Sequence, residues 1–245
     1  SNIIVCGTRR TGTSLMVEMI AKNENYVINK NDKDFRSNIK NIQPYLNEGL
    51  FVDGINESNS KEYLQCQKNV IKLLNIGLLC TDLKYFYSFK KIILMNRNWI
   101  TQVKSNKNLY KLNAENFLKD NKTKVKITDK DEFIKDYSYN DGIEYGYYYS
   151  WFIFDILKRN YKSKIIIINF EDLINNLNKV NKILKKHNLG IENSYKSVDK
   201  TIKKFNNIFD KRDLVEFKEG YFEYLDTLYN CIRFNSIDNN LIKLI

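Results

Sequence analysis

The segment that most constrains the fold of this chain lies at its start, where an apolar run breaks into a glycine-bounded turn. Residues 3–6 read Ile-Ile-Val-Cys, residues 7–12 read Gly-Thr-Arg-Arg-Thr-Gly, and a helical spacing of apolar residues begins at Leu15. A strand, a Gly-x-x-x-x-Gly loop and a helix start in this order form a cradle of backbone N–H groups for an anion. The sequence therefore predicts a phosphate-binding loop at the carboxyl end of a buried strand.

The predicted loop differs from a nucleoside-triphosphate site at one position. Such a site has Lys directly after the second glycine, which reaches the terminal phosphates, followed by Ser or Thr, which binds magnesium. Here Thr13 occupies the lysine position, and the cationic side chains lie inside the loop at Arg9 and Arg10. The loop still favours an anionic ligand, but it has lost the residue that marks a metal-dependent triphosphate enzyme.

Strand-like runs and helical spacings alternate along the rest of the chain. The apolar runs cover residues 3–6, 76–80, 92–95 and 165–168, and the helical spacings cover 13–22, 61–75, 99–107, 143–159, 178–188 and 213–232. This alternation predicts a doubly wound α/β fold similar to the P-loop NTPases, with a parallel central sheet, helices on both faces and the ligand at the carboxyl ends of the strands. The length of 245 residues predicts a single domain over 1–245.

A second polar constellation follows the apolar run at 92–95. Arg97 stands at the end of this predicted strand, and Ser105 lies eight residues later on the predicted helix. Eight residues are a little more than two helical turns, so Ser105 falls on roughly the same side as the helix start. A long arginine and a hydroxyl can then share one anion.

Together, the two constellations resemble the cofactor-binding motifs of the sulfotransferases that use 3′-phosphoadenosine 5′-phosphosulfate (PAPS), in the bacterial or viral type. The family's 5′-phosphosulfate loop reads approximately Pro-Arg/Lys-Ser-Gly-Thr-Thr/Ser, and residues 9–14 read Arg-Arg-Thr-Gly-Thr-Ser. Its 3′-phosphate motif is Arg-Asn-Pro with a Ser eight residues after the Arg, which matches residues 97–99 and Ser105. Arg9 and Trp99 stand where the family has Pro.

Two further segments support the resemblance, which spans residues 3 to about 175. Residues 165–173 are similar to the family's strand followed by Tyr-Glu-Asp-Leu, with Phe170 in place of Tyr. Residues 47–53 are similar to the Asn-Pro-x-Gly-Tyr-Phe-Glu segment of bacterial members, with Val52 at the position of the acid. Residues 176–245 carry no assignable motif and are expected to form a helical C-terminal part.

The resemblance implies an enzyme that moves the sulfuryl group of PAPS to a hydroxyl or amine without a metal and leaves adenosine 3′,5′-bisphosphate. It assigns Arg10 to the leaving-group and sulfuryl oxygens, and Arg97 with Ser105 to the 3′-phosphate. The 5′-phosphate is assigned to the loop groups of Thr11, Gly12, Thr13 and Ser14. Arg9 is expected to face solvent. The acceptor stays open among carbohydrates, small molecules, lipids and peptides.

The acceptor also needs a base, and family members use His or a carboxylate. The single histidine, His187, lies in a predicted helix beyond the last motif and is expected at the surface. A carboxylate is therefore preferred, from the group Asp32, Asp34, Glu48, Asp53 and Glu57. Asp53 is the first choice because it follows the Gly-Leu-Phe segment, one residue after the position of the family's acid.

Two other classes of protein remain as alternatives. A P-loop nucleotide kinase or NTPase with a degenerate Walker A loop would explain the glycine spacing, and Glu171-Asp172 after a strand could bind a metal; Thr13 counts against it. A net charge of +11, from 40 Lys and Arg against 29 Asp and Glu, also suits a nucleic-acid-binding module. Its groove-reading motifs are not apparent, so no nucleic-acid partner is expected.

Cysteine spacing and hydropathy indicate whether the protein binds a metal, forms disulfides or enters a membrane. The four cysteines form no C-x-x-C pair, so no metal site is expected, and Cys6 and Cys80 are expected to be buried free thiols in a reducing compartment. No segment approaches the roughly 20 apolar residues that span a bilayer. The sequence thus predicts a soluble, cytoplasmic protein with no membrane insertion.

Overall fold

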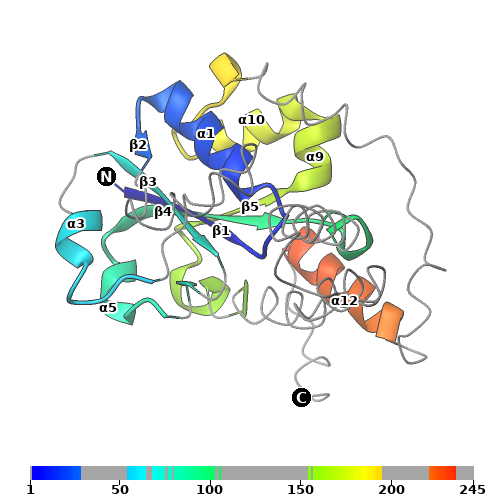
Figure 1. Ribbon diagram of the computed structural model, residues 1–245. Helices are drawn as coiled ribbons and strands as arrows, with labels where there is room; N and C mark the ends of the chain where they lie inside the picture. The colour runs from blue at the N-terminus through cyan, green and yellow to red at the C-terminus, as the bar shows by residue number, and fades with distance from the viewer. Residues whose placement is uncertain are drawn as a thin grey trace, which may run out of the picture.

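The core of the protein is a parallel β-sheet. The computed structural model describes residues 2–28, 54–64, 68–74, 77–78, 80–102, 105, 154–155, 157–194 and 221–235. Its five strands are β1 (Asn2–Gly7), β2 (Val27–Ile28), β3 (Asn69–Leu74), β4 (Phe89–Asn96) and β5 (Ile165–Asn169). They lie in the order β2-β3-β1-β4-β5 (Figure 1), and every neighbouring pair is parallel.

The strands are apolar because both faces of the sheet are covered. All six residues of β1 and all six of β3 are buried. Strand β1 lies at the centre, where Val5 pairs with Lys72 of β3 on one side and with Ile93 of β4 on the other. The loop that follows β1 therefore emerges between the carboxyl ends of β3 and β4.

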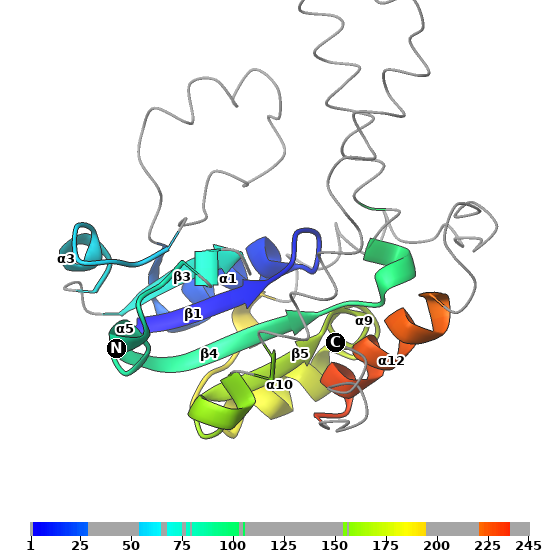
Figure 2. The same ribbon diagram turned by 90° about the horizontal axis from the view of Figure 1, so that it is seen from below.

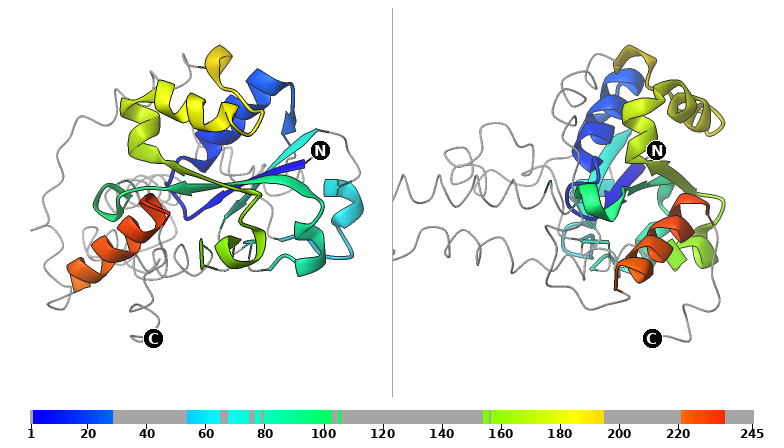
Figure 3. Two further views of the ribbon diagram at one scale, coloured as in Figure 1. Left: turned by 180° about the vertical axis from the view of Figure 1, so that it is seen from behind. Right: turned by 90° about the vertical axis from the view of Figure 1, so that its right-hand side faces the viewer.

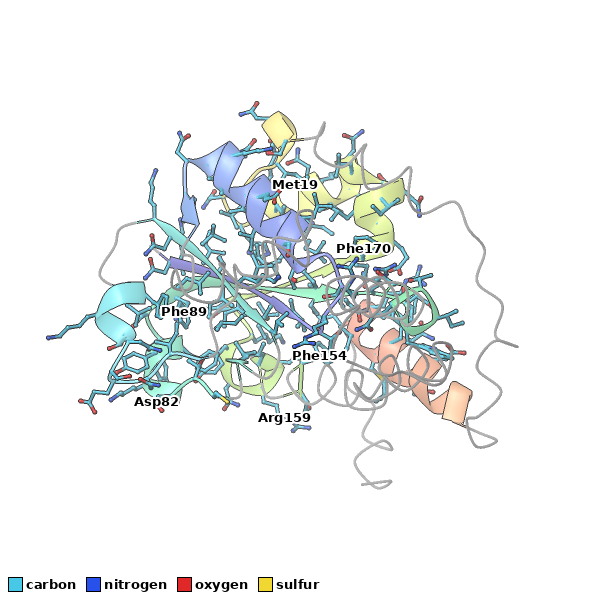
Figure 4. All side chains as sticks on the ribbon, in the orientation of Figure 1. Met19, Asp82, Phe89, Phe154, Arg159 and Phe170 are labelled. Carbon is cyan, nitrogen blue, oxygen red and sulfur yellow. The ribbon has the colours of Figure 1, made fainter. Side chains whose placement is uncertain are left out.

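Helices cover the sheet on both faces (Figure 3). One face carries α1 (Thr13–Glu24), α9 (Phe170–Asn175), α10 (Leu177–Lys185) and the 3-10 turn η2 (Glu192–Ser194), and the other carries α3 (Ser60–Leu64), α5 (Leu83–Phe86) and α12 (Tyr221–Arg233). The hydrophobic core under the first set of helices contains Met19 and Phe170, and the core on the opposite face of the sheet contains Phe89 and Phe154 (Figure 4). The structure confirms the expected α/β fold with a parallel sheet and helices on both sides of it.

Five of the ten predicted elements are found close to their predicted bounds. These are the strands at 3–6, 92–95 and 165–168 and the helices at 13–22 and 178–188. The predicted helices over 99–107, 143–159 and 213–232 are helical where they are described, and their remaining residues lie outside the described part of the chain. None of the described helices is long and apolar enough to cross a membrane.

The region around β3 corrects the sequence prediction. The predicted helix over 61–75 is wrong, because α3 ends at Leu64 and residues 69–74 form a fully buried strand between β2 and β1. The predicted strand over 76–80 is also wrong, because residues 77–78 are helical and Cys80 lies in a turn. Cys80 is consequently exposed, against expectation, whereas Cys6 in β1 is buried as expected. Burial raises the pKa of the Cys6 thiol.

Candidate functional site

The candidate site lies where the parallel strands end. Residues 8–12 join β1 to α1 at this edge of the sheet, and the segment after β4 and the helices α9 and α12 lie at the same edge (Figure 2). Because the carboxyl ends of parallel strands meet at one edge, residues distant in sequence come together there. The polar side chains of Arg97, Gln102 and Ser105, which follow β4, therefore contact the loop.

Both glycines of the loop are required by close approach. Gly12 has a φ of 87°, and a Cβ built there would lie 2.5 Å from a ring carbon of Phe170. A Cβ on Gly7 would lie 2.8 Å from the main-chain oxygen of Met95 in β4. Contacts this short do not occur with real Cβ atoms, so the loop can lie against β4 and α9 only with glycine at these positions.

The two loop arginines differ in their exposure to solvent. Arg9 is exposed, as expected, and Arg10 is half-buried. The Arg10 Nε donates a hydrogen bond to the Ser105 Oγ at 3.0 Å, which ties the loop to the residue eight positions beyond Arg97. The Thr11 hydroxyl donates to the Thr8 carbonyl at 2.7 Å. The hydroxyl proton of Thr11 is thus used within the loop, and its amide is the better group for an anion.

Arg97 directly follows β4, is only 5% exposed and contacts the loop through its guanidinium. Its Nη1 donates to the Arg10 carbonyl at 2.6 Å, and its Nε and Nη2 donate to the Thr101 hydroxyl and carbonyl at 3.1 and 3.0 Å. The guanidinium carbon lies 4.5 Å from the centroid of the Phe170 ring, a cation–π distance. Arg97 and Ser105 therefore both contact the loop through Arg10, one at its carbonyl and the other at its side chain.

Two residues of the site were not identified from the sequence. The first is Lys72 on β3, which is 3% exposed and whose Nζ donates to the Ser14 Oγ at 2.7 Å. Strand β3 thus supplies an ammonium to the first turn of α1, beside the position that lacks the loop lysine. The available signal was a single charged residue inside the apolar run Val-Ile-Lys-Leu-Leu at 70–74.

The second is Gln102, which is 4% exposed in the helical segment after Arg97. Its Nε2 donates to the Thr8 Oγ1 at 2.6 Å and to the Arg9 carbonyl at 2.8 Å. Only its position five residues after Arg97 could have drawn attention to it. A long amide at this place on the helix reaches the same loop as Arg97.

Helix α12 stabilises the end of β4. The Trp99 indole donates to the Asp226 carboxylate at 2.7 Å, and the Asn96 amide donates to the Tyr229 carbonyl at 3.4 Å. Glu171 completes this network, because it accepts from the Asn98 N–H at 2.7 Å and from the Tyr229 hydroxyl at 3.2 Å. Burial and the Glu171 charge raise the pKa of Tyr229. The C-terminal region, which carries no motif, thus positions the Arg97 segment.

The candidate bases are only partly described. Asp53, Asp32, Asp34 and Glu48 lie outside the described residues, and Glu57 is exposed. His187 lies just after α10 and is half-buried, and burial together with the charges of Lys91 and Lys186 lowers its pKa. Lys91 pairs with Ile3 near the start of β1, so His187 is near the edge of the sheet opposite to the loop.

The site combines main-chain N–H groups at a helix start with the cations of Arg10, Lys72 and Arg97. Such a set binds phosphate or sulfate groups.

No group of three or more His, Cys, Asp or Glu side chains that could hold a metal occurs among the described residues. In comparisons with known proteins, no family model matches the chain and no curated protein matches it significantly.

Proposed function

We propose that this protein is a sulfotransferase that moves the sulfuryl group of PAPS to a hydroxyl or amine of an acceptor. The observation that carries the proposal is the direct contact between the two motifs that resemble the family's cofactor site. Arg10 of the loop bonds Ser105 at 3.0 Å, and Arg97 bonds the Arg10 carbonyl at 2.6 Å. The parallel sheet with this loop after its central strand also supports the assignment of a P-loop NTPase-like fold.

In the proposed reaction, the acceptor oxygen or nitrogen attacks the sulfur of PAPS and the bond from sulfur to the 5′-phosphate oxygen breaks. The proton of the acceptor passes to a carboxylate, for which we propose Asp53, and adenosine 3′,5′-bisphosphate leaves. Negative charge grows on the bridging and sulfuryl oxygens as this bond breaks. Arg10 and Lys72 are the cations that we assign to this charge, and the loop amides hold the 5′-phosphate.

A second candidate function is a P-loop nucleotide kinase or NTPase. The observation that favours it is the contact of Lys72 with Ser14, because a lysine ammonium beside a hydroxyl in the first helical turn restores the pair that a triphosphate site uses. Thr13 remains the argument against it. The two functions differ in their need for magnesium and in the phosphates that they recognise.

Calorimetric titration distinguishes these functions. A sulfotransferase binds adenosine 3′,5′-bisphosphate without magnesium and much more tightly than ATP, whereas a kinase or NTPase binds Mg-ATP equally well or better. We expect Arg10→Ala to lose sulfuryl transfer while it still binds the bisphosphate. A screen of radiolabelled transfer from PAPS to sugars, small metabolites, lipids and peptides then identifies the acceptor class. Preference for Mg-ATP in the first titration would reject the sulfotransferase proposal.

A further inference from the structure

We propose that Gln102 and Arg97 are positioning residues that hold two successive carbonyls of the loop and thereby direct two loop amides at the bound anion. Gln102 binds the carbonyl of Arg9 at 2.8 Å, and Arg97 binds the carbonyl of Arg10 at 2.6 Å. The inference deepens the proposed function. It rests on one part of that function, namely that the loop binds a phosphate or a phosphosulfate. It gives Arg97 a task at the 5′ end of the ligand in addition to the 3′-phosphate.

The geometry of the peptide bond connects the carbonyls to the amides. In a trans peptide the C=O and the N–H of one plane point in opposite directions, and the described residues contain no cis peptide. The N–H of Arg10 shares a plane with the Arg9 carbonyl, and the N–H of Thr11 shares a plane with the Arg10 carbonyl. Because Gln102 and Arg97 hold both carbonyls on their side of the loop, both N–H groups face away from them.

Backbone strain at Arg10 shows why the loop needs such support. Arg10 has a φ of 66°, in the left-handed region that residues other than glycine rarely adopt. A conformation of this kind is unfavourable and persists only where its surroundings hold it. The guanidinium of Arg97 supplies a charge-assisted hydrogen bond to the carbonyl of this same residue. Arg97 thus stabilises the left-handed backbone conformation at Arg10 within the loop.

The amide of Gln102 can bind the loop in one orientation only. The Arg9 carbonyl can only accept a hydrogen bond, so the amide nitrogen must face it and the amide oxygen must point elsewhere. Among the described residues, this buried Oε1 has no hydrogen-bond partner. An unpaired buried acceptor lowers stability, and such groups in native structures call for an explanation. Orientation of the loop supplies that explanation.

Gln102→Leu tests this role through the affinity for different ligands rather than through stability. Leucine has a similar volume and removes the unpaired oxygen, but it also removes the hydrogen bonds to the Thr8 hydroxyl and the Arg9 carbonyl, so the unfolding temperature does not distinguish a positioning role from a structural one. The Arg9 peptide loses its brace, so ligands that carry a 5′-phosphate are expected to bind about tenfold more weakly, which corresponds to one or two lost hydrogen bonds. A residue with a merely structural role would weaken all ligands alike.

The test is calorimetry with three ligands: adenosine 3′,5′-bisphosphate, adenosine 5′-monophosphate and adenosine 3′-monophosphate. Gln102→Leu is expected to weaken the first two and leave the third unchanged, with Asn230→Leu, an exposed amide on α12, as the matched control. Unchanged binding of the 5′-monophosphate, or equal weakening of the two monophosphates, would overturn the proposal.

Arg97→Lys is the second variant, which keeps a positive charge but loses the fork of the guanidinium. If Arg97 positions the loop, this variant is expected to weaken binding of adenosine 5′-monophosphate, a ligand with no 3′-phosphate. Normal binding of this ligand by Arg97→Lys would limit Arg97 to the 3′-phosphate and overturn its role in the loop. If the wild type prefers Mg-ATP, the proposed function fails, but the effect of both variants on the loop can still be measured with Mg-ATP and inorganic pyrophosphate.

Discussion

Lys72 is a charged side chain in the middle of a fully buried strand. An ammonium in such a place is costly unless it is hydrogen-bonded, and the Ser14 hydroxyl supplies a bond at 2.7 Å. In a binding site, such a charge is positioned in advance for an anion, because no rearrangement is needed when the ligand arrives. The first turn of α1 therefore has a fixed cation although Thr13 replaces the usual lysine.

We expect Lys72→Met to weaken binding of adenosine 3′,5′-bisphosphate about tenfold or more, since a hydrogen bond to a charged group is lost. Methionine fills a similar volume, so the sheet should keep its unfolding temperature. The matched control is Lys90→Met, which removes an exposed lysine from β4. Isothermal titration of both variants measures the effect, and equal affinities in the two would show that Lys72 does not contact the ligand.

At the scale of elements, the sequence predicted β1, β4 and β5 from unbroken apolar runs and α1 from a helical spacing of apolar residues. It failed at β3, where Lys72 breaks the apolar run and makes Val70 and Ile71 look like one face of a helix. The same residue thus concealed both a strand and a site cation. Arg10, Arg97 and Ser105 could be named because they fall in spaced motifs. Gln102 could not, because its role depends on how the helix after β4 approaches the loop.

Helix α12 acts on the site through the indole of Trp99, which is fully buried and bonds Asp226. We expect Asp226→Ala to lower the free energy of unfolding by about 1–3 kcal/mol, because it leaves a buried N–H without an acceptor. Asp226→Asn retains an acceptor oxygen and should cost less. Urea denaturation measures both variants.

The control for this prediction is Asn230→Ala, an exposed position on the same helix. It should leave the free energy of unfolding unchanged. Because Trp99 follows Arg97 by two residues, Asp226→Ala should also weaken adenosine 3′,5′-bisphosphate, whereas Asn230→Ala should not. Equal stability of Asp226→Ala and the wild type would contradict the role that we give to α12.

For the whole molecule, the single histidine provides a direct probe of pH dependence. Burial, Lys91 and Lys186 lower the pKa of His187 below its ordinary value of 6.5. The unfolded chain therefore binds the proton more readily than the folded protein, so stability falls as the pH drops through about 6.5. Glu192, whose pKa is lowered to about 2 by Asn181 and Lys185, changes stability only below pH 4.5.

We expect the unfolding temperature to fall between pH 7.5 and 5.5 through this group, because the folded protein binds the proton less readily than the unfolded chain. His187→Gln should remove this part of the change, because glutamine does not titrate. Scanning calorimetry at both pH values measures the difference between the variant and the wild type. An NMR titration of the imidazole gives the pKa directly, and a value of 6.5 or above would refute the prediction.

The parallel pairing of β4 with β5 also has a consequence for synthesis on the ribosome. Asn96 at the end of β4 pairs with Asn169 at the end of β5, and Ile92 pairs with Ile165. Parallel neighbours cannot form a local hairpin, so β4 keeps an unpaired edge until residues 165–169 have left the exit tunnel. A nascent chain that has not reached this point presents the apolar strand Phe89–Asn96 to other chains and to chaperones. A pause of translation before residue 165 is therefore expected to favour aggregation of the nascent chain through β4.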